Sequence, residues 1–191
     1  IEQINSLITK KKQKYKISLL NIPFITVQDN ELIETNGNMW QAFYTPGHSV
    51  CSTTYLDLKN DILFVSDAMG EIISLDNWFP LAFDNIDDFI DSIDKLKALN
   101  SSTIALGHNG IITDLDAQMI FTHSIQGYHK TFQLISILQK TLSSEQIIDT
   151  ICEKYKNVER TFIPDDIYRK SIKTLLNNFK RESTLWQNIK L

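Results

Sequence analysis

Three side chains that could bind a metal ion each follow an apolar, strand-like run of the chain. They are His48, Asp67 and His108. Imidazole and carboxylate groups presented from loops at one edge of a rigid sheet suit zinc or another borderline divalent ion. Such an ion lowers the pKa of bound water to about 7, so the expected chemistry is hydrolysis by a metal-bound hydroxide.

Local sequence supports this interpretation at each position. Gly47 and Gly107 directly precede the two histidines and allow the backbone to turn sharply there. Asp67 follows the apolar run Ile62–Val65, where a carboxylate is costly unless a cation neutralises it. Alone, each residue could be an ordinary turn or capping residue, so the metal interpretation depends on all three together. The sequence contains no GxSxG, P-loop or GxGxxG motif.

The elements that would position these residues alternate between strand and helix up to residue 113. Hydrophobic spacing predicts helices at 3–20 and 86–99, strands at 24–27, 39–44 and 103–106, and a hairpin formed by 53–58 and 61–65. Beyond residue 113 only helices are predicted, at about 114–139, 143–155 and 164–181. We therefore expect an α/β (α+β) body at 1–113 and a helical extension at 114–191 that packs over it.

Composition limits the class of protein. The chain has 191 residues, 42% of them hydrophobic, and a net charge of -4, which argues against non-specific nucleic-acid binding. No apolar run is long enough to cross a bilayer, and no signal peptide is visible. Cys51 and Cys152 do not make a disulfide framework, so a reducing, cytoplasmic location is predicted.

Three motifs resemble those of a known family. The segments Thr45–Ser49, Phe64–Ala68 and Gly107–Gly110 resemble the third, fourth and fifth motifs of the metallo-β-lactamase superfamily, over roughly residues 1–112. The resemblance implies a four-layer αβ/βα sandwich with two divalent ions at the sheet edge. It also implies catalytic and metal-binding roles for three residues: His48 completes the first metal site, Asp67 bridges both ions and His108 belongs to the second. Zinc is the expected metal, with iron or manganese as alternatives.

One part of the family pattern is absent. The HxHxDH motif, which supplies the remaining ligands, does not occur in this sequence. We therefore expect the chain to be the C-terminal part of a longer hydrolase, or to need a separate N-terminal half that carries this motif. The isolated chain is then predicted to be poorly metallated and inactive, because most of the expected ligands are missing from it. It is also predicted to need its missing half to fold well, because half a sandwich leaves a large apolar face exposed.

The substrate would lie between the metal ligands, the segment after Asp67 and the helical extension. Candidate pocket residues are Met69, Glu71, Trp78, Phe79, His123 and Tyr128. The aromatic residues could instead pack in the core, while Glu71 and His123 could be exposed. Helical extensions of this kind are typical of ester- and thioester-cleaving branches, and the sequence is most similar to the branch that contains the quinolone-signal response thioesterase. The predicted substrate is a small ester, thioester or lactone.

Two alternatives stay open. The chain could be a catalytically inactive regulatory or binding module of the same fold, which the absent motif would favour. It could also be a helical interaction protein that forms a homodimer. The apolar residues of the helical extension that could form its interface are Ile147, Ile148, Ile151, Ile167, Ile172, Leu175, Leu176 and Phe179.

Overall fold

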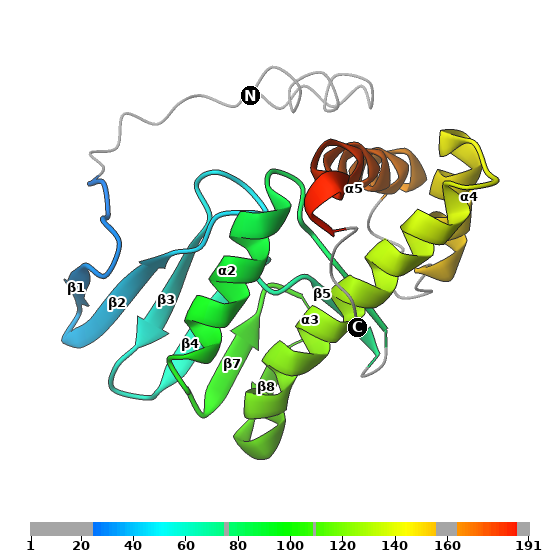
Figure 1. The fold of residues 1–191 in the computed structure, drawn as a ribbon. Helices are drawn as coiled ribbons and strands as arrows, with labels where there is room; N and C mark the ends of the chain where they lie inside the picture. The colour runs from blue at the N-terminus through cyan, green and yellow to red at the C-terminus, as the bar shows by residue number, and fades with distance from the viewer. Residues whose placement is uncertain (1–24, 75–76, 109, 156–163, 187–191) are drawn as a thin grey trace, which may run out of the picture.

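The computed structural model describes residues 25–74, 77–108, 110–155 and 164–186, so the helix predicted at 3–20 lies outside the described residues. Its largest element is a six-stranded sheet (Figure 1) with the order β1-β2-β3-β4-β7-β8. The strands of this sheet are β1 (Leu32–Thr35), β2 (Asn38–Tyr44), β3 (Thr53–Asp57), β4 (Ile62–Ser66), β7 (Thr103–Leu106) and β8 (Ile111–Thr113). The predicted mixed α/β class is confirmed.

Alternating side chains in β4 give the sheet two different faces. Leu63 and Val65 are fully buried, whereas Phe64 between them is 40% exposed. Strands β3 and β4 pair antiparallel, as the hairpin prediction required, and β4 pairs with β7 in parallel. A parallel pair needs a crossover, and helix α2 (Ile86–Lys97) supplies it. The Asn85 side chain caps this helix by accepting a hydrogen bond from the Asp88 amide.

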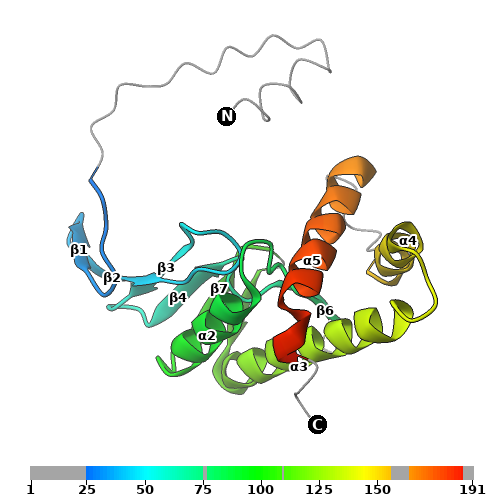
Figure 2. The same cartoon turned by 45° about the horizontal axis from the view of Figure 1, so that its top comes forward.

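The helices that the structure describes lie on one face of the sheet. Figure 2 shows α2 and α3 (Asp114–Leu138) on the same side of the strands. On the opposite side no described helix packs, and the register places Tyr44, Phe64 and Ile111 there. These three residues are 44%, 40% and 65% exposed. The sheet therefore has an uncovered apolar face.

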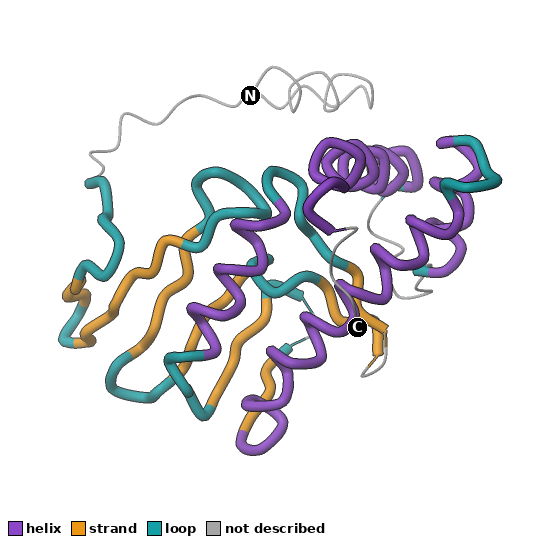
Figure 3. The backbone as a smooth tube through the Cα atoms, viewed as in Figure 1, coloured by secondary structure: helices purple, strands orange, loops and turns teal. Residues whose placement is uncertain are grey.

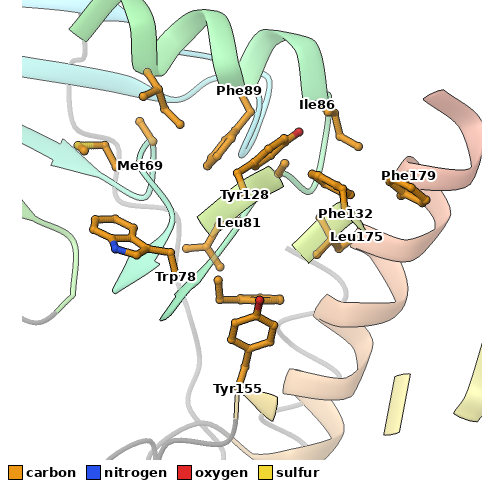
Figure 4. Close-up of a cluster of buried hydrophobic side chains, with 14 of the residues drawn as sticks. Met69, Trp78, Leu81, Ile86, Phe89, Tyr128, Phe132, Tyr155, Leu175 and Phe179 are labelled. Carbon is orange, nitrogen blue, oxygen red and sulfur yellow. The ribbon is translucent and has the colours of Figure 1, made fainter. Parts of the chain in front are cut away.

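The helical extension shares one core with the sheet. In Figure 4 Phe89 of α2 lies beside Tyr128 of α3, and Phe132 of α3 lies between Tyr128 and Phe179. Phe179 belongs to α5 (Asp165–Trp186), which packs against α4 (Ser144–Lys154). A capping box formed by Ser143 and Gln146 starts α4, close to the beginning of the helix predicted at 143–155. The division into two domains at residue 113 stays a prediction.

The dimer alternative meets a physical obstacle. All but one of the helical residues proposed as its interface are buried inside this chain, with at most 2% of their surface exposed. The exception is Ile167, which is 37% exposed. Residues that fill their own core are not available to a second copy.

Some predicted elements need correction. Residues 25–27 form a loop rather than a strand, and the first strand begins later, at Leu32. The segment after Asp67, for which no strand is predicted above, contains a small hairpin of β5 (Glu71–Ser74) and β6 (Asn77–Phe79). Figure 3 shows these short strands beside the end of the main sheet. Among the described residues, no helix has the length and apolar character needed to span a membrane.

Candidate metal centre

The three expected ligands lie together in one cavity. His48 is in the loop after β2, Asp67 directly follows β4, and His108 comes two residues after β7. Each oxygen of Asp67 faces a different histidine, with Oδ2 3.4 Å from His48 Nε2 and Oδ1 3.3 Å from His108 Nε2. The sheet edge therefore presents one carboxylate between two imidazoles.

The orientation of His48 is fixed by the loop before α2. Its Nδ1 lies 2.8 Å from the carbonyl oxygen of Leu81, which can only accept, so Nδ1 carries the proton and donates it. The same loop is held to the histidine loop by the Asp84 and Asn85 amides, which donate to the Gly47 carbonyl at 3.0 and 3.2 Å. In its neutral form, His48 therefore directs the lone pair of Nε2 toward the Asp67 carboxylate.

Backbone geometry directs Asp67 toward the same point. Ser66 before it adopts a φ of 49°, and the pairing with β7 shifts register between Phe64 and Ser66. Such irregularities commonly re-aim a side chain beside a functional site. The Gly107 amide donates to the Ser66 carbonyl at 3.0 Å, and a Cβ at Gly107 would come within 2.8 Å of Asp67 Oδ1. Glycine is therefore required where the His108 loop passes the carboxylate.

These residues suit a cation shared between them. A lone pair and a carboxylate oxygen repel each other unless a proton or a metal ion lies between them. Two ligand atoms about 2.0–2.2 Å from one ion, at tetrahedral angles, are about 3.3–3.6 Å apart, which matches both observed separations. Within the described residues no three His, Cys, Asp or Glu side chains converge on one point. Asp67 with each histidine therefore makes two half-sites.

The cavity that contains the three expected ligands is lined elsewhere mostly by apolar residues. It has a volume of about 370 Å³. The residues that line it besides the three ligands are Glu71, Phe79, Leu81, Phe83, Pro164, Ile167, Tyr168 and Ser171. Of the pocket residues predicted from the sequence, Glu71 and Phe79 are among them.

The other predicted pocket residues lie elsewhere. Met69, Trp78 and Tyr128 are no more than 2% exposed and belong to the core, where Tyr128 stacks on Phe89 (Figure 4). Trp78 reaches the core from β6, which contacts α3, and Tyr128 is a residue of α3 itself. His123 is half-buried on α3 and does not line the cavity. The core alternative thus describes these aromatic residues better than the pocket prediction.

The residues contributed by α5 were missed at the sequence level. Pro164, Ile167, Tyr168 and Ser171 have the spacing of one helical face. A second face of the same helix, containing Ile172, Leu175 and Phe179, fills the core. Two faces with apolar residues on one helix indicate that the helix contacts two different surfaces, but only the structure shows which face lines the cavity.

A family model and several solved structures match this chain. The family model described as the metallo-beta-lactamase superfamily matches residues 7–108, slightly more than half of the chain. A metallo-beta-lactamase family protein from Thermus thermophilus aligns at 18% identity with a TM-score of 0.58, covering 82% of this chain and 49% of that one. A double mutant of a sec-alkyl sulfatase aligns at 13% identity with a TM-score of 0.52, covering 84% and 26%.

An archaeal superfamily protein from Sulfolobus tokodaii also aligns, at 20% identity over 82% of this chain and 52% of that one, with a TM-score of 0.46. The chain therefore spans about half the length of the Thermus and Sulfolobus proteins. At these identities the solved structures bear on the fold alone.

Proposed function

Because the chain belongs to the metallo-β-lactamase superfamily, we propose that it contributes to a metal-dependent hydrolase of ester, thioester or lactone bonds. The observation that carries this proposal is the placement of Asp67, whose two oxygens each face the Nε2 atom of a different histidine. A carboxylate in this position can serve two ions at once.

The ligands would divide between two metal positions. His48 and Asp67 would hold one ion, and Asp67 and His108 the other. Divalent ions held there would acidify water and polarise the bond to be cleaved. Zinc is the proposed metal, with iron or manganese as alternatives, because imidazole and carboxylate accept all three.

The chain's own residues prepare the site for this role. The Leu81 carbonyl holds the His48 proton on Nδ1 and so keeps Nε2 free for a metal, an arrangement typical of metal-bound histidine. The apolar wall limits water beside the ligands, which strengthens the electrostatic interactions of a bound substrate. The helical extension takes part in this wall, which supports assignment to the thioesterase-like branch.

The remaining ligands would come from a second half that carries HxHxDH. The uncovered sheet face supports this part of the proposal, since it exposes Tyr44, Phe64 and Ile111 on the side without helices. A second sheet packed there would bury these residues and bring its own ligands to the same edge. The half could belong to the same polypeptide or to a separate one.

The Asp67→Asn variant of the full-length protein tests the function. It keeps the size of the side chain but removes the charge shared by both histidines. Turnover of p-nitrophenyl acetate should fall more than about 100-fold, because even the hydrogen-bond partners of metal ligands contribute about 10–100-fold.

Asp61→Asn is the matched control, because Asp61 lies at the other end of the same strand, β4, and does not line the cavity. Turnover in this variant should stay close to that of the wild type. Hydrolysis at the wild-type rate in the Asp67→Asn variant would refute the proposed mechanism.

A further inference from the structure

The apolar wall of the cavity begins directly beside a proposed metal ligand. The rings of His48 and Phe83 lie 5.3 Å apart, and Leu81 carries the carbonyl that fixes the same histidine. A group bound at the ligands therefore has hydrocarbon surface as its next neighbour.

The lining of the cavity also includes residues of the helical extension. Phe79 of β6 lies 5.9 Å, between ring centroids, from Tyr168 of α5. Tyr168 in turn donates a hydrogen bond from its hydroxyl to the Tyr155 carbonyl at 3.3 Å, which anchors the ring against the end of α4. Ile167 lies next to Tyr168 in the cavity wall and is 37% exposed. Two side chains of α5 therefore form part of the cavity wall.

The charges in the cavity also select among substrates. Among the described residues that line the cavity, the acidic and basic ones are Asp67, Glu71 and the two histidines, and none is lysine or arginine. Phosphate and carboxylate groups are usually recognised by such cations. The wall beyond the ligands therefore favours an uncharged apolar group over an anionic one.

We propose that this cavity is an acyl subsite, so that the substrate is an ester or thioester with an uncharged apolar acyl chain whose length is limited by Ile167 and Tyr168. This inference rests on the proposed hydrolase function. In the reaction, water adds its oxygen to the acyl carbon and the bond to the alcohol oxygen or thiol sulfur breaks. The products are the carboxylic acid and the alcohol or thiol, which takes up a proton.

Two series of probes separate the subsite from the chemistry. The first is the turnover of p-nitrophenyl acetate, butyrate, hexanoate and octanoate by the full-length, zinc-loaded protein. The second is the binding of acetamide, butanamide, hexanamide and octanamide, measured by titration calorimetry. The amides are uncharged and resist hydrolysis, so their binding reports on the wall alone. Affinity should rise about fourfold for each added methylene until the cavity is filled.

Substitutions at Ile167 should move this preference in opposite directions. Ile167→Trp fills the cavity and should lower the ratio of octanamide to butanamide affinity at least about tenfold. Ile167→Ala lengthens the cavity and should shift the best ester toward longer chains. Ile137→Trp is the matched control, because Ile137 is an exposed isoleucine of α3 that does not line the cavity. Thermal melting of each variant checks that it is folded.

The outcomes distinguish the two claims. Chain-length preference that is lost in Ile167→Trp and kept in Ile137→Trp supports the subsite, even if no ester is hydrolysed and the hydrolase proposal fails. Equal binding of all amides by the wild type, or the same preference in both tryptophan variants, overturns the subsite. The hydrolase proposal would survive that result if esters of every length were cleaved.

Discussion

The hydrogen bond from His48 Nδ1 to the Leu81 carbonyl decides which nitrogen faces Asp67. Without this bond either tautomer would be available, and the ring could turn away from the carboxylate. The sequence indicated His48 as a ligand from its type and its place after a strand. It gave no sign of Leu81, because a backbone carbonyl that acts as a partner leaves no trace in residue types.

Gly107 is the residue at which a single methyl group should disturb the metal centre. A Cβ there would lie 2.8 Å from Asp67 Oδ1 and from the Ser66 carbonyl, so Gly107→Ala should displace the carboxylate. We expect zinc affinity of the full-length protein to fall about tenfold or more, measured by competition with a chelator.

Gly110→Ala serves as the control for this substitution. Gly110 has a φ of 99°, but a Cβ there would have no atom within 4 Å. Strain should lower its stability without weakening zinc binding. Equal losses of zinc affinity in both variants, or none in Gly107→Ala, would contradict the proposed role of Gly107.

At the scale of elements, α5 is connected to the His48 loop as well as to the core. The Asn178 side chain is buried and donates to the Phe83 carbonyl at 2.6 Å and to the Ala82 carbonyl at 3.4 Å. These carbonyls belong to the loop whose Leu81 holds His48. The helical extension therefore supports the orientation of a ligand far from it in sequence.

Removing this connection should affect both stability and metal binding. Asn178→Leu keeps a similar volume but leaves two carbonyl groups without their donor, at a cost of about 1–3 kcal/mol in the free energy of unfolding. Zinc affinity should fall about tenfold because the loop is no longer held.

Asn177→Leu is the comparison, since Asn177 is the exposed neighbour on the same helix. Urea unfolding and zinc titration of both variants would check the prediction. Asn178→Leu that loses stability but binds zinc like Asn177→Leu would show that the connection supports only the core.

Strands β4 and β7 are joined at their far end by Asp61. The Ser102 amide and hydroxyl donate to its carboxylate at 2.8 and 2.7 Å, and these bonds hold the pKa of Asp61 below its ordinary value of 3.8. A lowered pKa in the folded state means that the stabilisation is present above pH 3.8. It is lost as the pH falls through the folded-state pKa.

Asp61→Asn should therefore be less stable than the wild type near neutral pH, by less than about 1 kcal/mol because the carboxylate is exposed. The difference should shrink toward zero in acid, where the wild-type carboxylate is protonated. Urea unfolding of both proteins along a pH series measures it. A difference that stays constant down to the most acid point would exclude this source of stability.

The elements that sequence could predict are those with strong local signals. The hairpin of β3 and β4 and the start of the helix predicted at 143–155 were both recognised from residues close together in the chain. The β5–β6 hairpin and β8 were missed because each strand has only three or four residues. Strands this short form through tertiary packing, which local sequence does not encode.

For the whole molecule, the proposed metal ligands could be predicted from the sequence, whereas the wall of the pocket could not. His48, Asp67 and His108 could be predicted to meet, because side chains at the ends of neighbouring strands gather at one edge of a sheet. The wall formed by Phe83 and Tyr168 could not, because it depends on how α5 docks against a loop about 90 positions earlier in the sequence. Long-range packing of this kind leaves only a helical stripe as its sequence signal.

One face of the sheet carries exposed aromatic residues. Trp40 and Phe64 lie 5.6 Å apart, between ring centroids, on the side that no described helix covers. Exposed aromatic surface of this extent in a sheet is a typical sign of a missing packing partner. It agrees with the proposal that a second half supplies further ligands to the two ions.

The most direct test of the shared metal centre is crystallography of the full-length protein grown with zinc, with data collected at the zinc absorption edge. Anomalous peaks about 2.0–2.2 Å from His48 Nε2, His108 Nε2 and both oxygens of Asp67 are the predicted result. Zinc bound only at other residues, or peaks that persist unchanged in Asp67→Asn crystals, would contradict the proposal that these three side chains hold the ions together.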